Sequence, residues 1–442
     1  MALSALDIFK LLPKTNCGDC GVPTCLAFAM KLANKQAELS ACPHVSDEAK
    51  STLDASSQPP QRLVTIGTGN LENKIGNETE LFRHEKKFVY ETAFALLIED
   101  TWDPAKIEST INSANNAKFE RVGQEMNLNL IAVKATSDNP DTFSKVVETI
   151  KSKTQLPLIL MSRKPEVLAP ALKIVAANKP LLHAATASNW EAMAKLASEN
   201  KVPLAVLDPT LDGLAELTGK ITGAGVKDLV LDFGPKSLGE TLTLATIHRR
   251  LALKKTFRPL GYPLMISTEH VTENDTAFAA IAAIKYGGIV IIKDLAPWKL
   301  YPMFTLRQNI YTNPQVPIQV KQDLYPINNP TENSPLLFTT NFSLTYFTVQ
   351  GDIETSKVPS WLQVVNTEGL SVMTAFAADK LTPDMVIKAL EESGASSKIS
   401  HNKLIIPGMV ARMSGKLNEK SGKEIIVGPR DSSKLPKFLK EL

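Results

Sequence analysis

The chain is 442 residues long, which gives room for about three domains. Its 49 Lys and Arg residues nearly balance its 46 Asp and Glu residues, so the net charge of +3 excludes the strongly basic composition of a nucleic-acid-binding protein or a polybasic membrane tether. The most apolar run, TAFAAIAAIKYGGIVIIK, is broken by Lys285 and two glycines, and we expect no membrane span, no nucleic-acid partner and a cytoplasmic location.

All four cysteines lie near the start of the chain, in the pattern C-x2-C-x4-C-x16-C formed by Cys17, Cys20, Cys25 and Cys42. Four thiolates gathered by short loops form a soft tetrahedral site, which suits an iron-sulfur cluster or a zinc ion. The uneven spacing and the Cys-Pro ending favour a 4Fe-4S cluster, because zinc sites usually have two evenly spaced C-x2-C pairs. The sequence therefore predicts a 4Fe-4S module over residues 1–44, with zinc or disulfides as alternatives.

Two short helices are predicted on either side of the cysteine motif. The segments LSALDIFKLLP and PTCLAFAMKLANKQAEL show apolar residues at three- and four-residue spacing. Gly18 and Gly21 allow a tight turn between them, whose amide groups can point at sulfur. After Cys42 the sequence becomes polar and ends in a proline pair, which predicts a linker over residues 45–60.

Residues 61–314 alternate short apolar runs with longer helical patterns. Eight such βα units in about 220 residues are typical of a TIM (β/α)8 barrel, and an open doubly wound sheet is the alternative. The segment RLVTIG predicts an extra hairpin at the bottom of the barrel. The eight predicted strands are Ala93–Glu99, Leu128–Val133, Leu156–Met161, Leu181–Ala185, Pro203–Leu207, Asp228–Phe233, Tyr262–Ser267 and Gly288–Lys293.

Charged residues follow many of these strands, at the end of the barrel where barrel enzymes carry their active sites. Capping of the following helix explains the same residues without any chemistry. The sequence shows no glycine-rich phosphate loop, no H-E-x-x-H helix and no nucleophile elbow. Both interpretations stay open for Glu99, Asp100, Lys134, Asp208, Asp232, Lys293 and Asp294.

A second irregular stretch with four prolines predicts another linker, over residues 315–335. Residues 336–442 then repeat a pattern of strand, loop and helix, which predicts a small flavodoxin-like or Rossmann-like domain. Ligands of such folds bind outside the C-terminal ends of the strands, so the loops NTEGLSVMT, IPGMVA and VGPRDSS form the candidate site. Their Gly, Ser and Thr residues and backbone amides suit a large ligand that carries amides or phosphate.

The TNCG-CG-PTC cysteine motif, the predicted barrel and the segments TTNFSLTYFT and NTEGLSVMTAFAADKLTP together closely resemble the large (gamma) subunit family of corrinoid iron-sulfur proteins of the reductive acetyl-CoA (Wood-Ljungdahl) pathway. This resemblance spans the whole chain. It implies that the C-terminal domain binds a cobamide, whose Co(I) accepts a methyl group from methyltetrahydrofolate through a methyltransferase and delivers it to acetyl-CoA synthase/CO dehydrogenase.

The resemblance further implies a methyltransferase component that acts as a carrier and uses its 4Fe-4S cluster to reactivate Co(II). It also implies a heterodimer with a small (beta) subunit. In such a protein the cobalt is the nucleophile, and no side chain is catalytic. Cobamide contacts carried over to the matching loops fall on Thr340, Thr345, Tyr346, Gly369, Leu370, Ser371, Val372, Met373, Thr374, Gly408, Met409 and Gly428.

Many cobalamin-binding modules supply a lower cobalt ligand from a D-x-H-x-x-G motif, which none of the six histidines here matches. Only His401 lies in the C-terminal domain, and the sequence predicts a base-off cobamide without a histidine ligand. Two other functions fit parts of the chain: an iron-sulfur electron-transfer or scaffold subunit without a corrinoid, and a pterin-dependent methyltransferase whose barrel does the chemistry.

Overall fold

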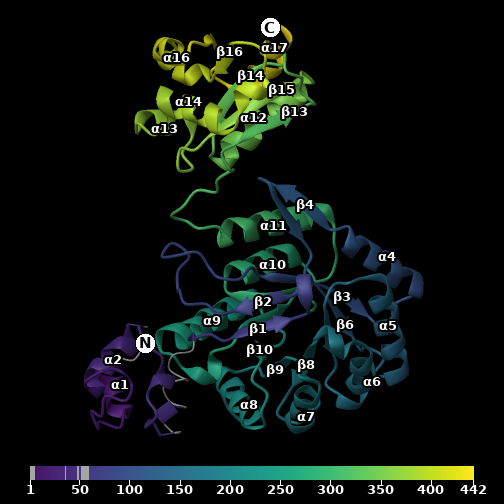
Figure 1. The fold of residues 1–442 in the computed structure, drawn as a ribbon. Helices are drawn as coiled ribbons and strands as arrows, with labels where there is room; N and C mark the ends of the chain where they lie inside the picture. Colours follow the sequence, from purple (N-terminus) through teal and green to yellow (C-terminus); the bar gives the residue numbers. More distant parts are fainter. Residues whose placement is uncertain (1–4, 35, 47–48, 51–58) are drawn as a thin grey trace. The chain divides into compact units, whose positions relative to one another are not determined.

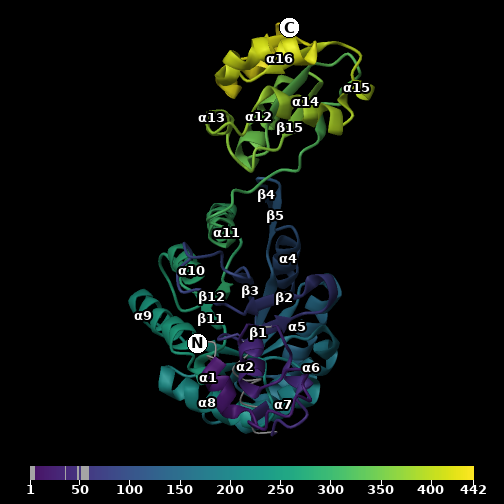
Figure 2. The same cartoon turned by 60° about the vertical axis from the view of Figure 1, so that its left-hand side comes forward.

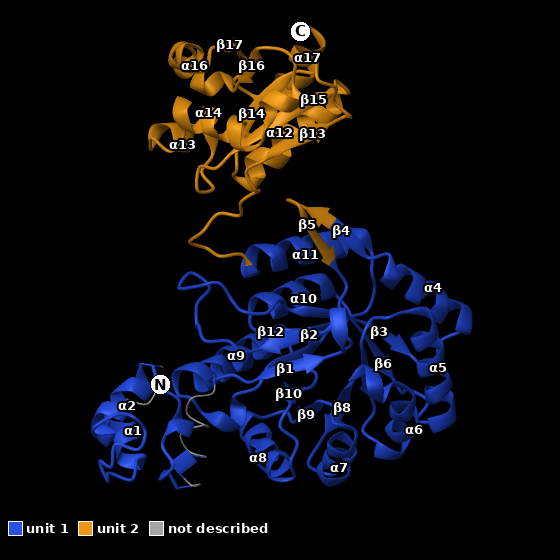
Figure 3. Ribbon diagram, viewed as in Figure 1, with its two compact units in different colours: residues 1–119, 127–311 blue, residues 120–126, 312–442 orange. Residues whose placement is uncertain are grey.

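The computed structural model describes residues 5–34, 36–46, 49–50 and 59–442 (Figure 1). The chain divides into two compact units, one of residues 1–119 and 127–311 and the other of residues 120–126 and 312–442 (Figure 3). Within the described residues, no helix is long and apolar enough to cross a membrane.

The cysteine module of the first unit is built on two helices, α1 (Ala5–Leu11) and α2 (Cys25–Ala33), as the sequence predicts. Their apolar faces share a small core, which also buries Val45 and Ala49. The predicted module border at residue 44 is therefore too early, because the module's own core needs residues beyond it. Residues 47–48 and 51–58 of the predicted linker lie outside the described residues.

Eight parallel strands close into a barrel in the order β10-β11-β12-β3-β6-β7-β8-β9 (Figures 1 and 2). All eight predicted strands are confirmed, and the alternative of an open sheet is wrong. The barrel strands are β3 (Ala93–Glu99), β6 (Leu130–Lys134), β7 (Leu158–Met161), β8 (Leu181–Ala185), β9 (Leu204–Leu207), β10 (Leu229–Asp232), β11 (Leu264–Ser267) and β12 (Gly287–Ile292).

A helix follows each barrel strand, and several begin with the residues that favour a first turn. Proline is the first residue of α4, α5, α6 and α11, where its missing N–H costs nothing. Ser237 and Glu240 form a capping box at the start of α9. The helices are α4 (Pro104–Asn115), α5 (Pro140–Lys153), α6 (Pro165–Val175), α7 (Trp190–Asn200), α8 (Leu211–Gly223), α9 (Leu238–Arg249), α10 (Asp275–Ile284) and α11 (Pro297–Tyr311).

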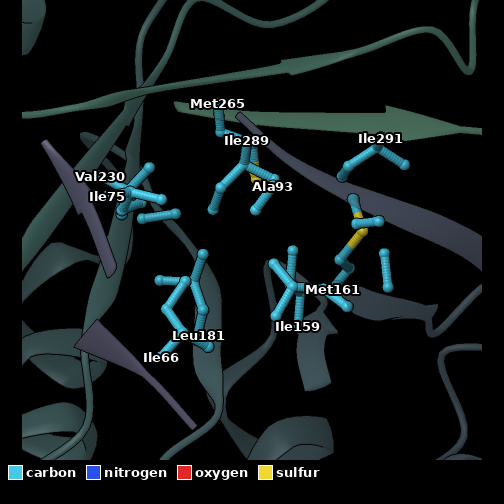
Figure 4. Packing of buried hydrophobic residues seen from close by; sticks show 14 of the residues in the cluster. Ile66, Ile75, Ala93, Ile159, Met161, Leu181, Val230, Met265, Ile289 and Ile291 are labelled. Carbon is cyan, nitrogen blue, oxygen red and sulfur yellow. The ribbon is translucent and has the colours of Figure 1, made fainter. Parts of the chain in front are cut away.

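The interior of the barrel is packed with the side chains of alternate strand residues (Figure 4). The strands β1 (Leu63–Ile66) and β2 (Asn73–Gly76) form an antiparallel pair whose Val64, Ile66 and Ile75 join this core. A side chain at Gly67 would collide with Pro157, directly before β7. The predicted hairpin thus closes the end of the barrel where the strands begin.

The second unit contains a five-stranded sheet in the order β13-β15-β14-β16-β17. All pairs are parallel except β13 with β15, and the chain reverses its direction of travel across the sheet between β14 and β16. The strands are β13 (Leu324–Ile327), β14 (Leu336–Thr340), β15 (Ser360–Val365), β16 (Lys403–Ile406) and β17 (Glu424–Val427), and the helices are α12 (Ser343–Ser356), α13 (Val372–Ala377), α14 (Pro383–Glu392), α15 (Ala395–Lys398), α16 (Ser414–Ser421) and α17 (Leu435–Lys440).

The prediction of an irregular linker over residues 315–335 is wrong at β13, which is an antiparallel edge strand of the sheet. Its Pro326 lies opposite Trp361 of β15. An edge strand tolerates proline, because only one of its sides needs backbone N–H donors. A second missed pair, β4 (Lys118–Arg121) and β5 (Gln124–Asn127), forms a short hairpin between α4 and β6.

Candidate functional site

A cavity of about 460 Å³ opens in the second unit, at the C-terminal ends of β14 and β16. This is the point where the strand order reverses, and it is where open α/β sheets usually bind their ligands. One wall is helix α12 and the other is formed by the loops that follow β15, β16 and β17. Its floor is apolar, with Leu337, Phe338, Ile405, Ile406 and Leu435 among the lining residues.

One hydroxyl in this cavity has no hydrogen-bond partner in the described part of the chain. Thr339 of β14 lines the cavity and is only 1% exposed, yet its Oγ1 atom is buried without a partner. The hydroxyls of Thr340 and Ser343 nearby are buried and unpartnered in the same way. Buried polar groups are nearly always hydrogen-bonded, so the three orphaned hydroxyls near this cavity are candidates for contact with a ligand.

The loops after β16 and β17 approach each other too closely for a side chain. A Cβ atom at Gly408 would lie 2.4 Å from the carbonyl oxygen of Gly428, and one at Gly428 would lie 3.1 Å from the carbonyl oxygen of Ile406. Glycine is therefore required at position 408 for the shape of this side of the cavity, and a side chain at Gly428 would need a small shift of its neighbours.

The loop after β15 is held by one buried side chain. The Asn341 side-chain oxygen accepts hydrogen bonds from the backbone N–H groups of Thr367 and Gly369, at 2.9 and 3.0 Å. Gly369 has a φ of +77°, in the region that favours glycine. This fixed loop carries Ser371, Val372 and Met373 to the cavity.

The structure brings together half of the residues that the resemblance singled out. Six line the cavity: Thr345, Ser371, Val372, Met373, Met409 and Gly428. Four others lie within two residues of these in the chain without lining the cavity, namely Gly369, Leu370, Thr374 and Gly408, and Thr340 follows the lining residue Thr339.

Tyr346 lies elsewhere, 5% exposed and packed against Tyr325 with 5.1 Å between ring centroids. Burial raises the pKa of Tyr346 to about 12, which keeps it neutral. As a set, these contacts stay a prediction.

The sequence analysis did not name several of the residues that line the cavity. Leu344, Thr348 and Val349 lie on the same wall of α12 as Thr345, and the helical spacing around Thr345 could have identified them. The loop VGPRDSS was expected at the site, and it contributes Pro429, Arg430, Asp431 and Ser432.

His401 is committed to structural hydrogen bonds. Its Nε2 atom lies 2.8 Å from the carbonyl oxygen of Ser334, and its Nδ1 atom accepts from the backbone N–H of Lys403 at 3.1 Å. Neither ring nitrogen is thus available to a ligand, and His401 is not among the residues that line the cavity.

The cysteine motif forms the second candidate site. Cys25 is the first residue of α2, after the capping residue Thr24, and its backbone N–H donates to the Asn16 side-chain oxygen at 2.8 Å. Cys25 and Cys42 are buried in the module core, Cys20 is half-buried and Cys17 is exposed. Gly18 and Gly21 take positive φ values of 81° and 74°, which lets the loop turn between the first three cysteines.

Other groups lie beside the exposed cysteine. Ligand atoms of Cys17, Asp19 and His44 lie within 4.8 Å of one another, and the His44 Nε2 atom is 2.6 Å from an Asp19 oxygen. Hydrogen bonds from His44 and then Cys17 hold the pKa of the Asp19 carboxyl below its usual value. The donor set of four free thiols in one small module still fits an iron-sulfur cluster best, because soft thiolates are its usual ligands.

The charged residues at the barrel's strand ends mostly serve the fold. Asp208 accepts from the backbone N–H of Thr210 at 2.9 Å, and Asp100 accepts from that of Ser137 at the same distance. Asp294 pairs with Lys299 at 2.8 Å. These three acids cap or tether the loops in which they lie, as the capping interpretation expects.

The other strand-end groups pair with one another at the mouth of the barrel. His183 and Asp232 are 2.8 Å apart, and Lys134 pairs with Glu269. The Lys293 ammonium donates to the carbonyl oxygen of Val271, and Glu99 accepts from Thr136 at 2.9 Å. Because each of these groups already has a partner, the mouth gives weaker evidence of a ligand than the cavity of the second unit.

A cysteine module, a closed parallel barrel and a second parallel sheet with a cavity define a multidomain α/β protein with a candidate metal-cluster site and a separate ligand site. Residues 12–44 match the family described as a putative Fe-S cluster. Residues 63–439 match the family described as the CO dehydrogenase/acetyl-CoA synthase delta subunit.

The chain is 44% identical to the corrinoid/iron-sulfur protein large subunit of Moorella thermoacetica, over 99% of this chain and 98% of that protein. It is 36% identical to the acetyl-CoA decarbonylase/synthase complex subunit gamma 1 of Methanosarcina mazei, again over 99% of this chain and 98% of that protein. The chain therefore belongs to the family of corrinoid/iron-sulfur protein large subunits and acetyl-CoA decarbonylase/synthase gamma subunits. Among solved structures, dihydropteroate synthase of Thermus thermophilus is similar with 18% identity and a TM-score of 0.39, covering 57% of this chain and 100% of that one.

Proposed function

We propose that this chain is a corrinoid methyl carrier of the acetyl-CoA pathway. It accepts a methyl group from methyltetrahydrofolate through a methyltransferase and delivers it to acetyl-CoA synthase. The observation that carries the proposal is the cavity at the reversal point of the second sheet, with its orphaned Thr339 hydroxyl, in a chain whose relative is named for a corrinoid.

The residues of this cavity fit part of a cobamide. A volume of about 460 Å³ is within the usual range for a drug-sized ligand, and it is too small for a corrin ring together with its nucleotide. Part of the cofactor would enter the cavity, where the apolar floor would exclude water and the Thr339 hydroxyl would be a candidate hydrogen-bond partner. The exposed residues Leu344, Met373 and Met409 at the cavity would hold the rest. When bound, the cobamide supplies a cobalt centre that holds and releases a methyl group.

The cobamide binds without a histidine ligand. His401, the candidate from the sequence, uses both ring nitrogens within the fold. A cobalt without a strong lower nitrogen donor is easier to reduce, which suits a carrier that must be kept in its reduced state.

Cys17, Cys20, Cys25 and Cys42 hold a 4Fe-4S cluster that supplies single electrons for reactivation of Co(II). We further propose that the chain works as a heterodimer with a smaller subunit. A cytoplasmic location stays a prediction from the sequence.

A methyl-transfer assay tests the proposal. Purified protein, loaded with cobamide and chemically reduced, is mixed with a corrinoid-dependent methyltransferase and isotope-labelled methyltetrahydrofolate. We expect label to appear on the protein-bound corrinoid, and only when both proteins are present. Transfer without any corrinoid would support the barrel methyltransferase instead, and a protein that binds a cluster but no corrinoid would support the electron-transfer subunit.

A further inference from the structure

The side chain of Asn341 joins two separate segments of the second unit. Asn341 directly follows β14 and is 2% exposed. Its side-chain oxygen accepts from the backbone N–H groups of Thr367 and Gly369, and its Nδ2 atom donates to the side-chain oxygen of Gln319 at 3.0 Å. Because two backbone donors fix the orientation of this amide, its own N–H groups must point the other way, toward Gln319. One buried amide therefore ties the loop after β15 to residue 319.

Residues 317–320, here called the entry segment, also hold the start of α12. The backbone N–H of Ser343 donates to the carbonyl oxygen of Ile318 at 3.0 Å, and the N–H of Val320 donates to the carbonyl oxygen of Asn341 at 2.9 Å. Helix α12 and the loop after β15 both contribute walls of the cavity. The entry segment is thus bonded to both walls, although these described residues do not line the cavity themselves.

Gly369 packs so closely against the entry segment that a side chain does not fit. Its φ is +77°, and a Cβ atom there would lie 2.9 Å from side-chain carbons of both Pro317 and Gln319. Carbon atoms in ordinary contact are about 3.5–4.0 Å apart. A residue other than glycine would therefore have to displace the loop or the entry segment. The positions of these two segments are set together.

We infer that Asn341 is a positioning residue for the ligand of the cavity, and that it acts by tying the cavity loop to the entry segment. The loop carries Ser371, Val372 and Met373 to the cavity. Without the tie the loop would sample other positions, and the apparent affinity falls in proportion to the fraction of molecules that hold the binding position. The entry segment, which the sequence predicts as part of a linker, thereby belongs to the binding site. The choice of a cobamide as the ligand rests on the proposed function.

Two substitutions test the tie without removing the buried amide itself, whose loss could prevent folding. Gln319→Met, at an exposed residue, removes the acceptor for Asn341 and should weaken cobamide binding about 2- to 12-fold, the range for one net hydrogen bond. Gly369→Ala forces the loop and the entry segment apart and should weaken binding by at least as much. Titration of the full chain with cobamide, followed by absorption, measures both affinities.

Each variant has a matched control in the second unit. Gln350→Met makes the same exchange on α12, at a side chain that donates to Glu354 of the same helix. Gly422→Ala imposes a similar backbone strain, because Gly422 has a φ of +65°, but its Cβ atom would meet no described atom within 4 Å. Both controls should keep the parental cobamide affinity. Denaturant unfolding should show that both glycine variants lose stability, while only Gly369→Ala also loses affinity.

Hydrogen exchange of the cofactor-free protein gives a second readout that needs no corrinoid. The backbone N–H groups of Thr367 and Gly369 should exchange faster in Gln319→Met than in the parent, and at the parental rate in Gln350→Met. Parental cobamide affinity in both test variants would overturn the inference, as would an equal loss of affinity in Gly422→Ala. A parent that binds no cobamide would refute the proposed function. Faster exchange would then still support the tie, and unchanged exchange would overturn it.

Discussion

Replacing Thr339 with Val should have opposite effects on the empty and the loaded protein. The Thr339 hydroxyl is buried at the cavity and has no partner among the described residues. An unsatisfied buried hydroxyl costs about 1–3 kcal/mol, and valine has nearly the same shape. The cofactor-free Thr339→Val protein should therefore be more stable than the parent by about that amount.

The same substitution should weaken the binding of the cobamide, although it stabilises the cofactor-free protein. If the hydroxyl pairs with the cobamide, its removal loses a net hydrogen bond of about 0.5–1.5 kcal/mol, which weakens binding about 2- to 12-fold. Denaturant unfolding of cofactor-free protein measures the first effect, and titration with cobamide, followed by its absorption, measures the second.

Thr305→Val provides the matched control. The Thr305 hydroxyl, on α11 of the first unit, is also buried without a partner in the described residues. This variant should stabilise the cofactor-free protein and leave cobamide affinity unchanged. A Thr339→Val protein that is less stable when empty, or that binds cobamide as tightly as the parent, would refute the assignment of this hydroxyl to the cofactor.

Three further predictions concern the other groups of the chain. Cys20→Ala should remove the intact 4Fe-4S signal from the electron paramagnetic resonance spectrum and stop reductive reactivation, while chemically reduced protein still accepts methyl groups; loss of the methyl transfer as well would contradict a role in reactivation alone. His401→Ala should leave the Co(II) resonance spectrum without nitrogen hyperfine splitting, as in the parent, and a splitting that the substitution removed would show that His401 is a ligand after all. Burial lowers the pKa of His248 from 6.5 to about 4. Between these two pH values the unfolded chain binds a proton at this residue and the folded chain does not. The free energy of unfolding should therefore fall by about 3 kcal/mol as the pH drops from 6.5 to about 4. His248→Gln should flatten that part of the denaturation profile, and an unchanged slope would argue against the buried neutral imidazole.

The barrel was predictable because its strands are buried on both sides. The run LNLIAV is apolar from Leu130 onward, and only its start shifts, from Leu128 in the prediction to Leu130 in β6. Strands with little burial gave no such signal. In β4 and β5 only Met126 is buried, and the turn between them places Val122 and Gly123 at φ values of 53° and 67°. A β-branched residue is rare in that conformation, so Val122 stood where a hairpin turn usually has Asn, Asp or Gly.

Of the residues that line the cavity, only those in the loops could be predicted from the sequence. Glycine, serine and threonine after predicted strands mark the C-terminal edge of a parallel sheet, and Ser371 and Gly428 were found there. The wall from α12 depends on which face of that helix turns toward the loops, and this is set by tertiary packing. Thr345 and Tyr346 are adjacent in sequence, yet one lines the cavity and the other packs against Tyr325. The orphaned hydroxyl of Thr339 likewise becomes visible only when its neighbours are placed.

The central claim, that one chain holds both a corrinoid and an iron-sulfur cluster, is tested most directly by the visible spectrum and metal content of protein purified without oxygen. We expect corrin bands together with broad cluster absorption, and about four iron atoms per cobalt, as a 4Fe-4S cluster requires. Cluster absorption without cobalt, or zinc in place of iron, in a correctly folded protein would contradict the claim.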